Sequence, residues 1–288
     1  MVSGGVLVAC ALSLLLVSCG GGGGGGSDDE DASPTIVSSV SNAITGSSVF
    51  IDGRTVTIWA RWCSDHEVTQ AEYQSVMGSN PSYFSGTNKP VEQVSWYDAI
   101  TYCNKRSLAE NLTPCYTVSG VDFSGDVTVP TSYDETWNAA ECDFSANGYR
   151  LPTEAEWEYF ARGGNVTNNG QTTYSGSNTI GDVAWYRENA YDVGTSSPDY
   201  GTHPVKTKAK NSLNLYDMIG NVWEWCWDWC VSVSASTSSA GASSGSYRVL
   251  RGGGWGTVAT YCSVAYRRSY GPGIRGYDVG FRVVRSAR

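Results

Sequence analysis

One recurring pattern predicts three short helices, each starting with a hydroxyl residue that precedes an acid by three positions. The hydroxyl caps a free amide of the first turn, and the acid returns a hydrogen bond to the cap. Apolar residues at helical spacing follow each pair, and Gly78 and Gly163 mark the ends of the first and third helices. The three pairs are Thr69 and Glu72, Ser95 and Asp98, and Thr153 and Glu156.

Alternating apolar and polar positions predict strands elsewhere in the chain. Asp52-Gly53 lies between β-rich runs over 49–58, which is typical of a two-residue hairpin. Tryptophan occupies every second position from 223 to 229, so a strand there would present its indoles on one side, and we expect them to pack in the core. Further strand-like segments are 247–250, 262–267 and 279–284.

The composition favours one loop-rich α+β domain. The chain has 288 residues, and its 34 Gly, 18 Tyr and 11 Trp supply many turns and a large core, which excludes wholesale disorder. The net charge is -9, although the segment from Arg248 onward carries eight Arg and a single Asp. The rest of the chain is therefore strongly acidic. We expect no nucleic-acid partner, because phosphate contacts need a basic face.

The N-terminal segment predicts export and tethering. Residues 6–17 form an apolar run that is too short to span a bilayer but is typical of a signal peptide. The run ends in a Leu-Val-Ser-Cys motif that resembles the lipobox of bacterial lipoproteins, which implies acylation of Cys19; an ordinary signal peptide is the alternative. The seven glycines and the acids that follow are typical of a flexible coil. We therefore expect a signal peptide over 1–18, a lipid-anchored tether over 19–45, a folded domain over 46–288, and a location at the outer membrane or cell surface.

Seven cysteines follow Cys19, and an odd number leaves at least one thiol unpaired. Their spacing does not form the paired C-x2-C motifs of a structural zinc site. The sequence leaves the disulfide connectivity open. The one disulfide that we expect joins Cys115 and Cys142, which flank an apparent insertion. The seven are Cys63, Cys103, Cys115, Cys142, Cys226, Cys230 and Cys262.

Four blocks, taken together, resemble the formylglycine-generating enzyme (sulfatase-modifying factor) superfamily. The resemblance covers most of residues 50–285 and implies a C-type lectin-like fold with a few short helices. The glutamates of the first block more often solvate a helix face or pair with arginine than catalyse. The blocks read Tyr-Arg-Leu-Pro-Thr-Glu-Ala-Glu-Trp-Glu-Tyr at 149–159, Leu-Tyr-Asp-Met-Ile-Gly-Asn-Val-Trp-Glu-Trp at 215–225, Arg-Gly-Gly-Gly-Trp at 251–255 and Gly-Phe-Arg at 280–282.

The resemblance also implies metal sites that the residues can be tested against. Asn221 and Glu224 match positions near a calcium site of the enzyme family, and oxygen ligands suit that ion. The alternative is that both side chains hold backbone amides. The copper-binding cysteine pair of the family corresponds here to Thr257 and Cys262. A hydroxyl cannot replace a thiolate on Cu(I), so we expect no enzyme and no cofactor other than the candidate calcium.

The C-terminal block resembles the variable region of proteins diversified by retroelements, in particular the treponemal TvpA type, a lipoprotein with this kind of domain. In such systems, adenines of template Asn codons are randomised, which cannot produce Lys, Glu, Gln, Met or Trp. Residues 256–279 contain none of these five types. The resemblance implies a variable ligand-binding region over about 255–280.

Residues of the C-terminal block separate into two sets. Those that match the scaffold pattern are Arg251, Trp255, Ala259, Cys262, Ala265, Arg267, Pro272, Arg275, Gly280, Phe281 and Arg282. The others form the predicted variable set: Gly256, Thr257, Val258, Thr260, Tyr261, Tyr266, Arg268, Ser269, Tyr270, Gly271, Gly273, Ile274, Gly276, Tyr277 and Asp278. This set is rich in Tyr, Gly and Ser, as antibody paratopes are. We expect its tyrosines to be exposed; the alternative is that they are half-buried strand residues.

Three functions remain open on the sequence alone. The first is a surface-displayed lipoprotein that binds a protein or another surface ligand through a diversified C-terminal region. The second is a sulfatase-activating oxidase, which the family blocks favour and Thr257 opposes. The third is a structural lipoprotein of the cell envelope with no variable partner. We expect the first.

Overall fold

The computed structural model describes residues 35–37, 43–44, 56–58, 61–164, 170–233, 238 and 240–286, all within a compact unit that spans Ala32–Arg288. The predicted signal peptide, Cys19 and the hairpin turn at Asp52-Gly53 lie outside the described residues. No helix in the described ranges combines the length and the apolar character that crossing a membrane requires.

The three helices predicted from their caps are confirmed. They are α1 (Gln70–Met77), α2 (Trp96–Ala109) and α4 (Glu154–Ala161), and each begins with a complete capping box. Gly78 ends α1 in the left-handed conformation, with φ at 78°, which a side chain would disfavour. Shorter helical segments are α3 (Glu135–Asn138), α5 (Ile180–Val183), a π-helical turn at Arg187–Tyr191 and a 3-10 turn at Ala259–Tyr261.

A first antiparallel sheet joins segments that are distant in the sequence. Its order is β1 (Thr35–Val37), β4 (Arg61–Cys63), β12 (Val284–Ser286) and β7 (Tyr149–Arg150). Two smaller ladders pair β2 (Ala43–Ile44) with β3 (Val56–Thr57), and β5 (Tyr116–Thr117) with β6 (Glu141–Cys142). Because β1 and β2 lie inside the predicted tether over 19–45, the folded domain begins before residue 46. The Thr-Ile-Val run of β1 is β-branched, a composition that suits a strand.

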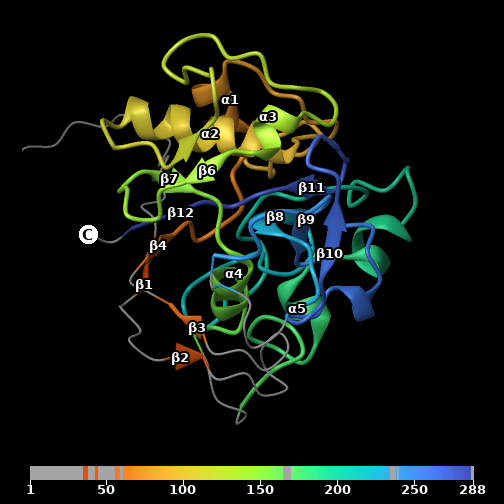
Figure 1. Ribbon diagram of the computed structural model, residues 1–288. Coiled ribbons are helices and arrows are strands. Elements are labelled where there is room, and N and C mark those ends of the chain that lie inside the picture. The colour runs from red at the N-terminus through yellow and green to blue at the C-terminus, as the bar shows by residue number, and fades with distance from the viewer. Residues whose placement is uncertain are drawn as a thin grey trace, which may run out of the picture. The chain divides into compact units, whose positions relative to one another are not determined.

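A second sheet carries the C-terminal block. Its order is β10 (Arg268–Tyr270), β9 (Arg248–Arg251), β8 (Trp223–Trp229) and β11 (Val279–Gly280), with β11 parallel to β8. The predicted strand over 262–267 is wrong: these residues form turns, and β10 begins after them. In Figure 1, α1 and α2 lie side by side, and α4 packs against β8 and β9.

Tryptophans of β8 pack in the core as expected. Trp223 and Trp225 are fully buried between α2 and the second sheet, and Trp229 is nearly so. The glutamates of α4 are buried too, so the solvated helix face is excluded and the pairing with arginine is confirmed. The pairs are Glu154 with Arg267, Glu156 with Arg150 and Glu158 with Arg251.

All seven cysteines of the described residues are free thiols, so the bridge expected between Cys115 and Cys142 is not formed. The register of β5 and β6 explains why. It pairs Cys142 with Tyr116, and adjacent residues of a strand project to opposite faces. Cys142 therefore lies opposite Tyr116 rather than Cys115, and the thiol of Cys115 donates to the carbonyl of Gly148 at 3.3 Å.

Candidate functional site

The predicted variable region, 255–280, follows β9 and contains the 3-10 turn, β10 and β11 with their connecting loops (Figure 1). β10 lies at the edge of the second sheet and pairs only with β9. These three elements contain eight of the 26 residues, so most of the region is loop, and the site depends on how the rest of the domain holds that loop.

Arg251 at the end of β9 holds the start of the region. Its side chain is fully buried, and its guanidinium donates to the carbonyls of Val264 (3.1 Å), Ala265 (2.9 Å) and Tyr266 (2.6 Å). The same group forms an ion pair with Glu158 of α4. One arginine thus folds three successive residues into a turn, which is why the predicted strand over 262–267 does not form.

Further contacts hold the remainder of the region. Arg267 donates to both carboxylate oxygens of Glu154, at 2.6 and 2.8 Å, and Arg275 pairs with Asp98 at 2.9 Å. The backbone amides of Gln93 and Trp96 donate to the carbonyls of Gly276 and Pro272, each at 2.9 Å. Partners outside the region therefore position its backbone at both ends.

Most residues of the predicted variable set are exposed to solvent as expected, but two of its tyrosines are half-buried. Fourteen of the fifteen residues are at least partly exposed. Tyr261 and Tyr277 are 49% and 55% exposed, so the expectation is confirmed for them. Tyr266 and Tyr270 pack against the core and are half-buried, as the alternative has it.

Three residues do not have the exposure or packing that their predicted set, variable or scaffold, implies. Thr257 is only 7% exposed, because its hydroxyl accepts the amide of Gly254 at 3.0 Å. Gly273 lies so close to Ser132 that an added Cβ would meet that backbone at 2.8 Å. Ala265, predicted as scaffold, is exposed and contributes only its carbonyl to Arg251.

Two neighbouring cavities open beside these residues. We call the first the variable pocket; it has a volume of about 420 Å³ and is lined by Arg187, Tyr191, Trp255, Gly256, Thr257, Val258, Tyr261, Arg268, Tyr277 and Asp278. Seven of these ten belong to the predicted variable set. We call the second the aromatic cleft; it has a volume of about 640 Å³ and is lined by Tyr83, Phe84, Tyr191, Thr195, Tyr200, Trp255 and Tyr277.

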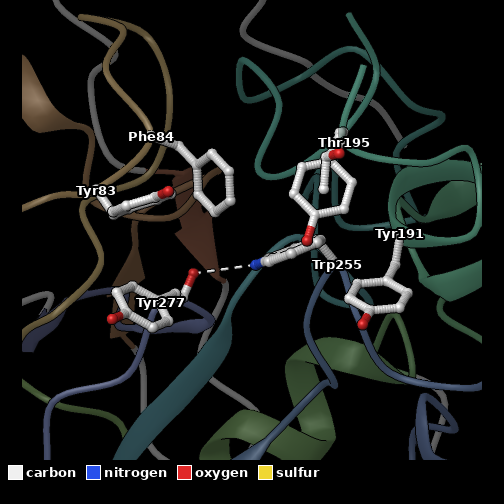
Figure 2. Close-up of a pocket in the computed structure, with 7 residues that line it drawn as sticks. Tyr83, Phe84, Tyr191, Thr195, Trp255 and Tyr277 are labelled. Carbon is white, nitrogen blue, oxygen red and sulfur yellow. Dashed lines mark hydrogen bonds between the residues drawn. The ribbon is translucent and has the colours of Figure 1, made fainter. Parts of the chain in front are cut away.

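Trp255 lies at the centre of the aromatic cleft, with Tyr277 on one side and Tyr191 on the other (Figure 2). Its indole N–H donates to the carbonyl of Tyr277 at 3.0 Å. The sequence did not indicate that Tyr83, Phe84, Tyr191, Thr195 and Tyr200 line a cleft. These residues are distant in the sequence from the C-terminal block. The only sequence signal is that these aromatic residues stand in polar, turn-rich segments.

Asn221 and Glu224 do not fit a calcium ion. Both carboxylate oxygens of Glu224 accept from Arg282 at 2.7 Å, so a divalent cation there would lie against a guanidinium. The amide nitrogen of Asn221 donates to Glu67 at 2.7 Å, and its oxygen accepts the amide of His203 at 3.0 Å. The alternative expectation, that both side chains hold backbone amides, is therefore confirmed for Asn221 and not for Glu224. Over the described ranges, no cluster of three or more His, Cys, Asp or Glu is arranged to hold a metal.

Thr257 and Cys262, at the copper positions of the enzyme family, lie next to each other. The thiol of Cys262 donates to the carbonyl of Thr257 at 3.7 Å. Burial, followed by the charge of Glu188, raises the pKa of Cys262 to about 12, so its sulfur is a thiol at neutral pH. Cu(I) binds thiolates, and this pair supplies neither two sulfurs nor a ready thiolate.

Comparison with known proteins defines the class first. The sulfatase-modifying factor enzyme 1-like domain model matches residues 25–287, and the chain belongs to this family. It is 35% identical over 165 residues to the formylglycine-generating enzyme of Streptomyces coelicolor, which covers 53% of this chain and 51% of the enzyme. The chain thus spans about half the length of that enzyme.

Other relatives match along nearly the whole chain. A chaperone protein, LppX of Paenibacillus barcinonensis, is 39% identical over 255 residues, covering 84% of this chain and 85% of that protein. Among solved structures, Treponema denticola variable protein 1 superposes with a TM-score of 0.78 and 40% identity, over 88% of this chain and 94% of that one. The chain is therefore similar to a treponemal variable protein and has the formylglycine-generating-enzyme type of C-type lectin fold.

Proposed function

We propose that this protein is a surface-displayed lipoprotein that binds a ligand through the variable set of residues 256–278, and that a retroelement diversifies this set. One observation supports the proposal: buried Arg251 holds the backbone of the region, while fourteen of the fifteen residues of the variable set are at least partly exposed. Substitution there changes the surface without removing the contacts that hold it. The likeness to Treponema denticola variable protein 1 supports the same conclusion.

Attachment at Cys19 is the second part of the proposal and rests on the lipobox-like motif. An acylated Cys19 would hold the domain at the outer membrane or cell surface, where a varied surface meets external ligands. Labelling with a radioactive fatty acid is expected to mark the wild type and to leave Cys19→Ser unlabelled. Equal labelling of both would remove the anchor from the proposal.

Oxidase chemistry is the second candidate, because the chain belongs to a family that contains formylglycine-generating enzymes. The Thr257 and Cys262 pair argues against it, since one buried thiol cannot make the two-thiolate copper site. Purified protein incubated with copper and a sulfatase-type cysteine peptide is expected to form no formylglycine. Turnover would contradict the proposal directly.

Diversification is tested in the genome. The DNA that flanks the gene is expected to encode a reverse transcriptase and to contain a near-identical copy of codons 256–279 that differs only at adenines. If both are missing, the remaining candidate is a structural lipoprotein of the envelope with no variable partner.

The separation of surface from framework is tested on the protein. A variant that combines Tyr261→Ser, Ile274→Ser and Tyr277→Ser removes the three most exposed apolar side chains of the variable set. Its free energy of unfolding is expected to stay within about 2 kcal/mol of the wild type, because each side chain is about half exposed and the variant loses only the ring contacts of Tyr261 and Tyr277. A large loss of stability would show that these side chains belong to the framework.

A further inference from the structure

The aromatic cleft is built almost entirely from residues that the proposed diversification would leave unchanged. Five of its seven lining residues lie outside 255–280, and Trp255 belongs to the scaffold set. Tyr277 alone is in the variable set. Every variant of the region would therefore keep the same cleft beside a changed surface.

We infer that the aromatic cleft binds an extended, proline-rich segment of a protein ligand, as a constant subsite next to the variable pocket. This inference rests on the proposed function and deepens it, because it names the class of ligand. Three features of the cleft carry it: the arrangement of the rings, the hydrogen-bonding groups that they present, and the charges around them.

Several rings stand nearly perpendicular to one another, whereas Tyr191 is tilted by 37° to Trp255. Phe84 meets Trp255 at 5.0 Å between ring centroids and 80°, and Tyr200 meets Trp255 at 5.0 Å and 72°. Tyr83 meets Phe84 at 4.9 Å and 88°. Such an arrangement presents both ring faces and ring edges to one cavity (Figure 2). Grooves lined with aromatic side chains accept the rings of a polyproline II helix, whose shape is already formed before binding.

The cleft presents hydroxyl groups that can donate hydrogen bonds to a ligand. The hydroxyls of Tyr83, Tyr191 and Tyr277 have no hydrogen bond to any residue that the structure describes. A polyproline II segment has unpaired carbonyls and, at proline, no N–H, so it matches a set of donors. The lining contains no carboxylate or amide side chain.

Charge favours a neutral ligand. No lining residue of the cleft is charged, yet two cations lie against its rings. Lys89 Nζ is 5.8 Å from the centroid of Phe84, and the guanidinium of Arg187 is 5.4 Å from that of Tyr191. Because Arg187 is paired with Asp192 at 3.1 Å and Lys89 lies in the field of Glu92, these cations are partly balanced, and the cleft attracts neither an anion nor a quaternary ammonium group strongly.

The cleft also continues into the variable surface. It shares Tyr191, Trp255 and Tyr277 with the variable pocket. A segment seated in the cleft would carry the flanking residues of the same ligand directly to the variable set. The constant subsite would supply part of the affinity for every ligand, and the variable pocket would select among them.

The test uses the full chain and two fluorescent peptides, a decaproline and a Gly-Ser decapeptide of equal length, with binding measured by fluorescence anisotropy. Decaproline is expected to bind, and the Gly-Ser peptide is not. Tyr83→Ala and Tyr191→Ala are expected to weaken decaproline binding about tenfold, because aromatic anchors dominate such contacts. Tyr133→Ala is the matched control, since Tyr83 and Tyr133 are both 64% exposed and Tyr133 does not line the cleft.

Failure of decaproline to bind overturns the inference, as does equal weakening by Tyr133→Ala. Binding of choline or of an oligosaccharide in its place, lost with Tyr83→Ala, also overturns it and names a different ligand class. These outcomes are distinct from failure of the proposed function, which the flanking DNA decides.

Discussion

Among single residues, the glycines of the variable set are not equivalent. A Cβ at Gly273 would lie 2.8 and 2.9 Å from backbone atoms of Ser132, whereas the nearest atom to a Cβ at Gly271 is 3.7 Å away, on Ile274. Gly273→Ala must displace backbone, and we expect it to lower the free energy of unfolding by about 1–3 kcal/mol. Gly271→Ala is expected to change it little. Urea denaturation of both variants checks this, and equal stabilities would mean that the loop adapts to either side chain.

Buried Glu156 predicts a loss of stability in acid. Burial alone would raise the pKa of this carboxyl, but the charges of Arg150 and Arg61, with the amide of Thr153, hold it at about 2. Because that pKa lies below the ordinary value of 4.5, the ionised group stabilises the fold above pH 4.5, and its contribution is lost as the pH falls toward 2. Glu156→Gln is expected to cost about 3 kcal/mol at pH 7, since it removes the negative charge that pairs with the buried Arg150 and Arg61.

The measurement is urea denaturation of the wild type and Glu156→Gln between pH 7 and pH 3. The difference between the two proteins is expected to be constant down to about pH 4.5, the ordinary pKa of the carboxyl, and to shrink below it. A difference that does not change with pH would contradict the assignment of the acid transition to this residue.

On the scale of structural elements, Arg251 connects β9 and α4 to the turn at 264–266. A lysine has a single point charge and cannot bind three carbonyls and a carboxylate in one plane. We expect Arg251→Lys to lower the free energy of unfolding by about 2–4 kcal/mol and to speed amide hydrogen exchange over 262–267. Arg268→Lys is the control, because Arg268 stacks on Trp223 and Tyr270 and donates to no backbone carbonyl among the described residues. Similar exchange in the two variants would mean that Arg251 does not hold the turn.

Elements with a local cause could be predicted from the sequence. The helices follow from caps at Thr69, Ser95 and Thr153, whose partners lie three residues away. The strand expected over 262–267 was wrong because the conformation there depends on Arg251, which contacts the turn but is distant from it in the sequence. Pairing of β1 into the first sheet was missed for the same reason, since its partner is β4.

The site divides in the same way. The variable set was indicated by one continuous block that lacks the residue types which adenine randomisation cannot produce. Fourteen of its fifteen residues are at least partly exposed, as expected. The aromatic cleft could not be predicted, because Phe84, Tyr191 and Trp255 come from three segments that are distant in the sequence and meet only in the fold. Thr257 was assigned to the surface because a sequence cannot show that its hydroxyl holds the amide of Gly254.

On the scale of the whole molecule, the protein shares its fold with the formylglycine-generating enzymes but differs from them at the copper position. The domain belongs to a family with formylglycine-generating enzymes, yet Thr257 stands where that family has a copper-binding cysteine. Its neighbour Cys262 is in place, within contact of Thr257. Thr257→Cys is therefore expected to create a two-thiol site that binds about one Cu(I) per chain, since two sulfurs suit this soft ion. The wild type is expected to bind none under the same conditions.

Competition with a coloured Cu(I) chelator measures this binding, and Thr260→Cys is the control. Thr260 is exposed and lies three residues after Thr257. A cysteine there adds one thiol to the chain, but this thiol is not at the position that contacts Cys262. If Thr257→Cys binds Cu(I) and Thr260→Cys does not, a single side chain separates the enzyme site from the site in this protein. If the wild type binds as tightly as Thr257→Cys, the chemical case against oxidase activity is lost, and the peptide oxidation assay becomes the deciding experiment.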